Sequence, residues 1–168
     1  MTETLSDVLP NEVEAMTHRL LAIACDREVM LATAESCTGG LLGSLLTDVQ
    51  GASHAFERGF IAYSNEAKNE LLGVPHALIS EHGAVSRPVA IAMADGALEH
   101  SRADIALAVT GFAGKGGSDD EIGLVHFGCA RRGRETRHRE EHYGDLGRGP
   151  IRIACIKTAL FMLDEALR

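Results

Sequence analysis

Three short polar segments, at residues 35–40, 63–68 and 110–118, contain the side chains whose types and spacing are suited to chemistry. Each comes directly after an apolar run of strand length. A hydroxyl is a weak nucleophile at neutral pH until a base removes its proton, and the usual base is histidine. No histidine directly follows any of these runs, so the sequence points to Ser36 as a nucleophile and to Lys68 as its base.

Lys68 can accept a proton only when its amine is neutral. Its pKa must therefore lie below the ordinary value of about 10.4, as burial or a nearby cation would ensure. Tyr63 is a candidate to relay the proton or to orient the amine. The backbone N–H groups of residues 38–40, at the start of a predicted helix, are candidates to bind the oxyanion of an acyl-transfer intermediate.

Two alternatives stay open at this point. Residues 35–40 could form only a capped glycine turn, with Lys68 an exposed helical lysine. Thr38 also offers a hydroxyl close to the same turn, and the sequence does not decide which oxygen faces the amine. We favour Ser36 because a primary alcohol is the less hindered nucleophile.

The glycine-rich segment at residues 111–118 is a candidate phosphate site. Its N–H groups could surround an anion, with Thr110 and Lys115 assisting. The segment matches neither the P-loop nor the dinucleotide-binding pattern. A mobile surface loop explains the same composition equally well, so both interpretations stand.

Residues 138–142 match the zinc-binding pattern H-x-x-E-H, which works on a helix. Here the surrounding pattern is that of a strand, in which four residues separate the two imidazoles by roughly 13 Å. A zinc ion needs nitrogens at about 2 Å from itself, so we expect no metal and no other cofactor. The remaining histidines are scattered and are expected on the surface or in the core: His18, His54, His76, His82, His100 and His126.

Strands alternate with helices along the chain, which predicts an α/β fold, a three-layer α/β/α sandwich with a mixed, mainly parallel sheet. In such sheets ligands bind beyond the carboxyl ends of the strands, and this topology brings Ser36 and Lys68 to one edge. We expect one domain over residues 1–168, with 1–10 a loose arm and Asn11 capping the first helix. The predicted strands are 29–34, 55–63, 104–109 and a hairpin of 123–131 with 134–143; the predicted helices are 11–25, 41–49, 65–72, 87–100 and 150–167.

The composition narrows the class of protein. The 168 residues include 45% hydrophobic residues and carry a formal net charge of −8, which disfavours nucleic acid as a partner. The arginines of residues 131–139 are interrupted by glutamate and are expected at a solvated hairpin tip. Four widely spaced cysteines fit reduced thiols in the cytoplasm. No signal peptide or membrane-spanning run is evident.

Three motifs together resemble a known family. Residues 34–40 (AESCTGG), 56–68 (FERGFIAYSNEAK) and 82–86 (HGAVS) are similar to the C-terminal domain family of CinA, the competence-damage-inducible protein. The likeness runs from about residue 20 to the last helix. It implies a nicotinamide-nucleotide amidase of the stand-alone form that acts through a Ser–Lys dyad, at Ser36 and Lys68 in this chain, with Tyr63 and Thr110 in support.

The resemblance also implies a small mononucleotide as substrate and a homo-oligomer, a dimer or larger. A catalytically inactive pyridine-nucleotide-binding module and a purely structural, oligomer-forming domain are the alternatives. The chain departs from the family pattern in the shorter, proline-free loop at residues 114–117 and in the spacing of residues 144–148. The expected substrate-binding residues are Glu35, Thr38, Gly39, Gly40, Asn65, Thr110, Gly111 and Arg148.

Overall fold

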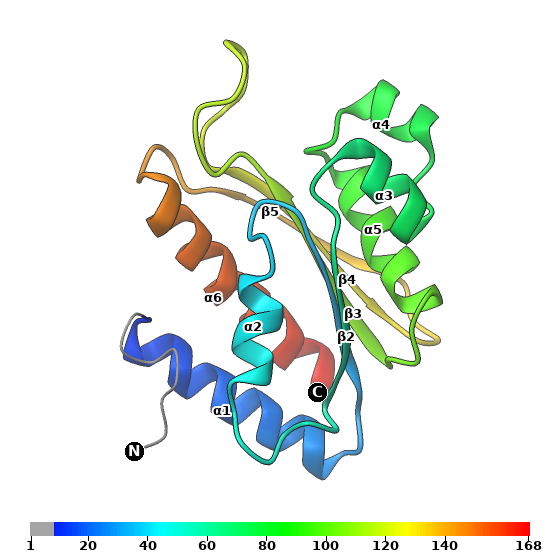
Figure 1. Cartoon of the computed structure of the whole chain (residues 1–168), viewed down its shortest axis with the longest axis vertical. Coiled ribbons are helices and arrows are strands. Elements are labelled where there is room, and N and C mark those ends of the chain that lie inside the picture. Colours follow the sequence, from blue (N-terminus) through cyan, green and yellow to red (C-terminus); the bar gives the residue numbers. More distant parts are fainter. Residues whose placement is uncertain (1–8) are drawn as a thin grey trace.

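The fold is built around one mixed sheet of five strands, as seen in a computed structural model that describes residues 9–168 (Figure 1). The strand order is β2-β1-β3-β4-β5. β1 (Leu31–Glu35) lies between β2 (Phe56–Ile61) and β3 (Ile105–Gly111) and is parallel to both. β4 (Leu124–Arg131) and β5 (Arg137–His142) continue the sheet as antiparallel strands. The predicted mixed sheet and the late hairpin are confirmed.

Helices cover both faces of the sheet, which confirms the three-layer sandwich. One face is covered by α1 (Asn11–Asp26), α2 (Leu41–Thr47) and α6 (Arg148–Leu167). The other face is covered by α3 (Asn65–Leu72), α4 (His76–His82) and α5 (Arg87–Glu99). In Figure 1 the two groups lie to the left and to the right of the sheet.

The central strands present different side chains to the two layers because successive residues of a strand point to opposite faces. Leu31, Leu107 and Phe127 pack with α1, α2 and α6, whereas alanines of β1 and β3 pack with α5. These small side chains let α5 approach the sheet closely. A Cβ at Gly128 of β4 would lie only 2.4 Å from the carbonyl oxygen of Ala90 in α5.

Most predicted elements occur within a few residues of their expected bounds, and α3 matches its predicted range of 65–72. Ser64 caps α3, since its Oγ accepts a hydrogen bond from the N–H of Ala67 at 3.0 Å. The predicted cap of the first helix is wrong: Pro10 occupies the cap position, and Asn11 is already helical. β3 continues through Gly111, beyond the predicted end at 109, because β4 pairs with it along its whole length.

α4 was not expected from the sequence. Its seven residues lie between Pro75 and Gly83, and two helical turns are too short to show a clear hydrophobic period. Most of the predicted N-terminal arm lies outside the described residues. Among residues 9–168, no helix combines the length and the apolar character needed to cross a bilayer.

Candidate active site

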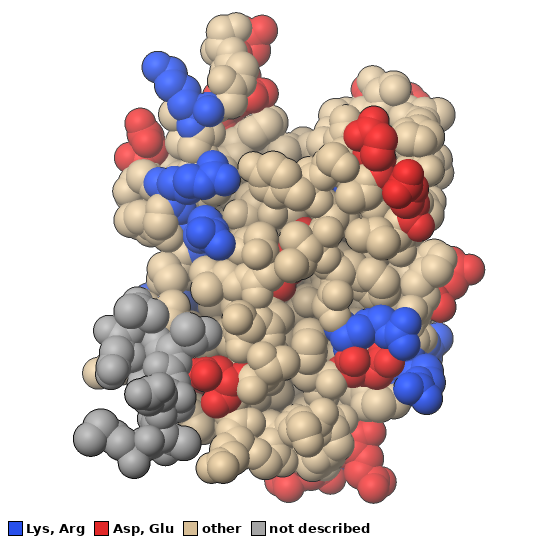
Figure 2. All heavy atoms as spheres, viewed as in Figure 1, with Lys and Arg blue, Asp and Glu red and all other residues tan. Residues whose placement is uncertain are grey.

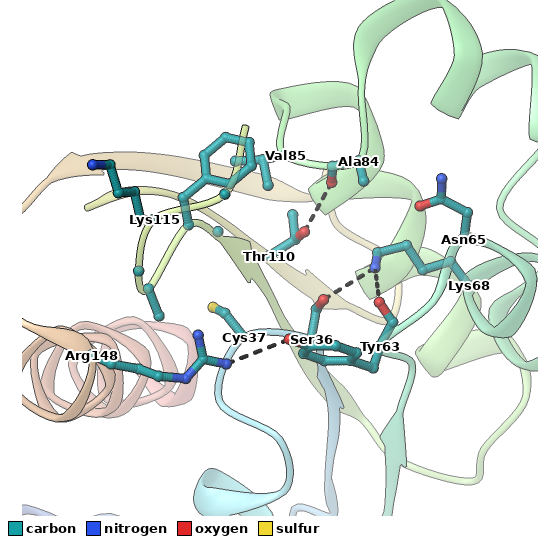
Figure 3. A pocket seen from close by; sticks show the side chains of 15 residues that line it. Ser36, Cys37, Tyr63, Asn65, Lys68, Ala84, Val85, Thr110, Lys115 and Arg148 are labelled. Carbon is teal, nitrogen blue, oxygen red and sulfur yellow. Dashed lines mark hydrogen bonds between the residues drawn. The ribbon is translucent and has the colours of Figure 1, made fainter. Parts of the chain in front are cut away.

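A cavity of about 300 Å³ opens beyond the carboxyl ends of β1, β2 and β3, where an α/β sheet is expected to bind its ligand (Figure 3). Ser36 enters it from the end of β1. Lys68 enters from the second turn of α3, and Thr110 from β3. The predicted residues that line the cavity are Ser36, Tyr63, Asn65, Lys68, Thr110, Gly111 and Arg148.

Ser36 and Lys68 are in direct contact. Lys68 Nζ lies 3.1 Å from Ser36 Oγ, 3.1 Å from the carbonyl oxygen of Ala62 and 3.3 Å from that of Tyr63. A neutral amine has two N–H donors and one lone pair. If the two carbonyl oxygens accept the two N–H groups, the lone pair is left for the Ser36 O–H. The three contacts therefore suit an amine that takes a proton from the serine.

Burial lowers the pKa of the Lys68 amine from its ordinary value, although the charge that Cys37 would carry as a thiolate opposes this effect. Only 1% of Lys68 and 7% of Ser36 is exposed. The three oxygens around the amine belong to uncharged groups, so these hydrogen bonds do not provide the opposite charge that would hold an ammonium in a buried place.

Glu35 faces away from the cavity, which corrects its expected role in binding substrate. Its carboxylate accepts hydrogen bonds from the N–H groups of Gly40 (3.1 Å), Leu42 (3.0 Å) and Gly43 (2.7 Å). A carboxylate is favourable at this point because the N-terminus of a helix carries partial positive charge. Glu35 thus fixes the start of α2 and, with it, the turn that follows Ser36.

The expected oxyanion site at residues 38–40 is not supported at its two glycines. The N–H of Gly40 donates to Glu35, and the N–H of Gly39 donates to the carbonyl oxygen of Ser36 at 3.1 Å. Neither glycine lines the cavity. Both have positive φ angles, 57° and 93°, so glycine serves the shape of the turn at these positions. These N–H groups are therefore not available to an oxyanion.

Thr38 is fully buried and outside the cavity, so the geometry does not support its expected contact with substrate. Its hydroxyl has no hydrogen-bond partner among residues 9–168. Its carbonyl oxygen accepts a hydrogen bond from Arg152 of α6 at 2.8 Å, a residue that the sequence did not single out. Of the two hydroxyls left open by the sequence, it is that of Ser36 that contacts Lys68.

Tyr63 lines the cavity but does not orient the amine through its side chain. Its backbone carbonyl contacts Lys68, while its phenol oxygen lies 3.4 Å from Arg148 Nη2 (Figure 3). The residue is 63% exposed, which fits a position at the mouth. The predicted relay through its hydroxyl is therefore not supported by the geometry, and Arg148 is the group that this hydroxyl meets.

Thr110 and Gly111 line the cavity from the end of β3. Thr110 Oγ1 donates to the carbonyl oxygen of Ala84 at 2.9 Å, which ties β3 to the segment after α4. A side chain at Gly111 is excluded because its Cβ would lie 2.6 Å from Val125 Cγ2. Asn65, one turn before Lys68 on α3, lines the cavity beside Lys68 (Figure 3).

Several lining residues were not predicted, above all Cys37. A hydrogen bond from the buried thiol of Cys155 lowers the pKa of Cys37. Ala84 and Val85 also line the cavity, and their signal was present in the HGAVS motif. The glycine-rich loop, which the sequence did single out as a candidate phosphate site, lines the cavity in part and includes Lys115, but the N–H of Gly117 is taken by Asp120 Oδ2 at 2.6 Å.

The mouth of the cavity is basic although the chain is acidic overall. Arg148 begins α6, and Lys115 belongs to the loop at residues 112–118. Figure 2 shows Lys and Arg side chains gathered at the upper left of the molecule, with acidic side chains at the loop tip above them and at the left edge. An anionic group such as a phosphate would be attracted to this side.

Known proteins match this chain in both sequence and structure. A family model described as "CinA C-terminal domain" matches residues 13–167. The nicotinamide-nucleotide amidohydrolase PncC of Escherichia coli is 47% identical over 122 residues, which are 71% of this chain and 74% of that protein. A CinA-like protein of Syntrophus aciditrophicus is 43% identical over 156 residues, 92% of this chain and 37% of the relative.

Solved structures of proteins from the same family also match this chain. The competence/damage inducible protein CihA from Agrobacterium tumefaciens superposes with a TM-score of 0.91 at 45% identity, covering 95% of this chain and 97% of the other. A CinA superfamily protein from Klebsiella pneumoniae has a TM-score of 0.87 at 30% identity, covering 92% and 97%. The first curated relatives are longer proteins, of which the matched segment makes up 27% to 37%.

Proposed function

Because this chain belongs to the CinA C-terminal domain family, we propose that it hydrolyses the amide of nicotinamide mononucleotide to nicotinate mononucleotide and ammonia. The observation that carries the proposal is the buried contact between Lys68 Nζ and Ser36 Oγ, at 3.1 Å, on the wall of the cavity. The similarity to an amidohydrolase that acts on nicotinamide nucleotide supports the choice of substrate.

In the proposed reaction, Lys68 takes the proton of Ser36 while Oγ attacks the carbonyl carbon of the amide. The tetrahedral adduct expels its nitrogen as ammonia, which receives the proton back from Lys68, and an ester remains on Ser36. Lys68 then deprotonates a water molecule that hydrolyses this ester to the carboxylic acid. The serine recovers its proton, so each cycle consumes one water and releases one ammonia.

The remaining lining residues orient the substrate in this proposal. Arg148 and Lys115 at the basic mouth pair with the 5′-phosphate. Tyr63 holds the Arg148 guanidinium, since their polar atoms lie 3.4 Å apart. Asn65, Thr110 and Gly111 bound the space in which the carboxamide lies.

The test is direct. Purified protein is incubated with nicotinamide mononucleotide, and ammonia and nicotinate mononucleotide are both measured, with nicotinamide riboside as the matched substrate that lacks the phosphate. We expect equal amounts of the two products and a much slower reaction of the riboside. Tight binding by calorimetry without any ammonia would refute the proposal in favour of an inactive pyridine-nucleotide-binding module.

A further inference from the structure

A second group of chemically capable side chains lies on the β4–β5 hairpin, and the proposed reaction does not use it. His126 of β4 and His138 and Glu140 of β5 each offer one ligand atom, and these atoms all lie within 4.8 Å of one another. We call these three residues the hairpin cluster. His138 and Glu140 belong to the H-x-x-E-H motif, whereas His126 is twelve residues away in sequence from His138.

The antiparallel register explains why the three side chains meet. His126 is paired with Glu140, and His138 is paired with Gly128. Residues two apart in a strand point to the same face, so His138 and Glu140 are on the face that His126 occupies. The two imidazole rings stack with centroids 5.3 Å apart.

The two distances from His126 to the other ligand atoms suit a single small ion. His126 Nδ1 lies 3.0 Å from His138 Nε2 and 3.7 Å from the nearer oxygen of Glu140, Oε2. Zinc binds imidazole nitrogen at about 2.0–2.1 Å, so two ligand atoms of a tetrahedral ion are roughly 3.3 Å apart. The two separations from His126 lie on either side of this value, and all three ligand atoms lie within 4.8 Å of one another, so the side chains need to draw together only slightly around an ion.

The surroundings are also those of a metal site. The other oxygen of Glu140, Oε1, lies 2.9 Å from His142 Nε2, and His142 Nδ1 lies 2.6 Å from Glu121. Such an outer chain of hydrogen bonds orients a ligating carboxylate. His126 is only 6% exposed, whereas Glu140 is on the open side, so an ion would have a protein wall behind it and solvent in front.

We propose that His126, His138 and Glu140 together bind one divalent transition-metal ion, with a water molecule in a fourth position. Two imidazoles and one carboxylate suit zinc and its neighbours in the first transition row, whereas magnesium and calcium prefer oxygen ligands alone. The ion would link β5, at the edge of the sheet, to β4. It would also stand beside the active-site wall, because His126 is the register partner of Thr110 in β3.

The H-x-x-E-H motif therefore contributes to the site in a different way from the one it would have on a helix. His138 and His142 do not act as the pair. The second imidazole comes from the neighbouring strand, and His142 supports Glu140 from outside. This inference is independent of the proposed amidase activity, since none of the three ligands lines the cavity.

The test uses tag-free full-length protein that has been treated with a chelator. Zn²⁺ is titrated by calorimetry, and Co²⁺ is added separately so that the visible spectrum reports the coordination number. His138→Gln and Glu140→Gln remove ligands, and His76→Gln, at an exposed histidine of α4, is the matched control. Thermal unfolding checks that each variant remains folded.

We expect one equivalent of Zn²⁺ to bind to the wild type and to His76→Gln, and a four-coordinate Co²⁺ spectrum. His138→Gln should weaken Zn²⁺ binding by at least roughly 100-fold, because removing a ligand should weaken binding more than removing a residue that only hydrogen-bonds to a ligand. His142→Gln, which removes such a residue, should weaken it by less. Equal Zn²⁺ affinity in the wild type and in folded His138→Gln would overturn the proposal, as would the absence of binding to the wild type.

Discussion

Replacing Glu35 with glutamine should destabilise the protein strongly while leaving substrate affinity almost unchanged. Glu35 is 1% exposed, and its two carboxylate oxygens accept three backbone N–H groups at the start of α2. A glutamine side chain has one acceptor oxygen and one NH₂ group. If that oxygen still accepts the N–H groups of Gly40 and Leu42, the NH₂ group faces the N–H of Gly43. Two donors then meet, so the hydrogen bond from Gly43, the shortest of the three, is lost.

The expected cost follows from these contacts. A hydrogen bond to a charged group contributes about 1.5–3 kcal/mol, and a negative charge at a helix N-terminus contributes about 0.3–1 kcal/mol. Glu35→Gln should therefore lower the free energy of unfolding by about 2–4 kcal/mol. In a domain of this size, each kcal/mol corresponds to roughly 2–4 °C in Tm.

The assay is urea unfolding of the wild type and the variant, together with KM for nicotinamide mononucleotide. Glu12→Gln is the matched control, because Glu12, in the first turn of α1, forms an exposed ion pair with Lys157 whose loss should cost less than about 1 kcal/mol. A normal stability combined with a raised KM would refute this reasoning, since it would mean that Glu35 contacts the substrate and not α2.

Four further predictions follow from individual contacts. Burial lowers the pKa of Lys68, so the unfolded chain holds that proton more tightly than the folded chain does. Relative to Lys68→Met, the free energy of unfolding of the wild type in urea should therefore rise with pH between the lowered pKa and 10.5. The same pH dependence in the wild type and in Lys68→Met would contradict this. Arg148→Ala should raise the steady-state KM for nicotinamide mononucleotide by about 10- to 100-fold, because it removes the proposed partner of the phosphate. The KM for nicotinamide riboside, which has no phosphate, should stay unchanged. Gly96→Ala should cost at least about 1–3 kcal/mol in denaturant unfolding, because its Cβ would lie 1.9 Å from the Leu72 carbonyl oxygen. Thr33→Val should stabilise the fold by about 1 kcal/mol, because its buried hydroxyl has no partner among residues 9–168; a loss of stability would show that the hydroxyl is satisfied.

The sequence was most informative where local signals agreed. α3 has its predicted bounds because Ser64 caps its start and Gly73, with a φ of 67°, ends it. The contact between Ser36 and Lys68 was expected from topology, since the carboxyl ends of parallel strands meet at one edge. Neither inference needed knowledge of side-chain orientation.

Side-chain direction is what the sequence could not supply. Glu35 and Ser36 are neighbours at the end of a strand, where successive side chains point to opposite faces, so only one of them can face the cavity. The turn after them determines the choice, because α2 offers its free N–H groups to Glu35. The same motif that identified the serine therefore also predicted four substrate contacts that lie outside the cavity, at Glu35, Thr38, Gly39 and Gly40.

Long-range register was the other missing information. The hairpin cluster forms only because β4 and β5 pair with His126 opposite Glu140, and a shift by one residue would turn its side chains to the other face. The expected homo-oligomer remains a prediction, since one chain does not test it.

The central claim is that Ser36 attacks the amide with Lys68 as its base, and single-turnover rates of three variants test it most directly. Ser36→Ala and Lys68→Met should each release ammonia at least roughly 10³-fold more slowly than the wild type. Thr38→Val, which removes the neighbouring buried hydroxyl, should keep a rate within a few-fold of the wild type. Undiminished turnover in folded Ser36→Ala, or its loss in Thr38→Val alone, would contradict the account.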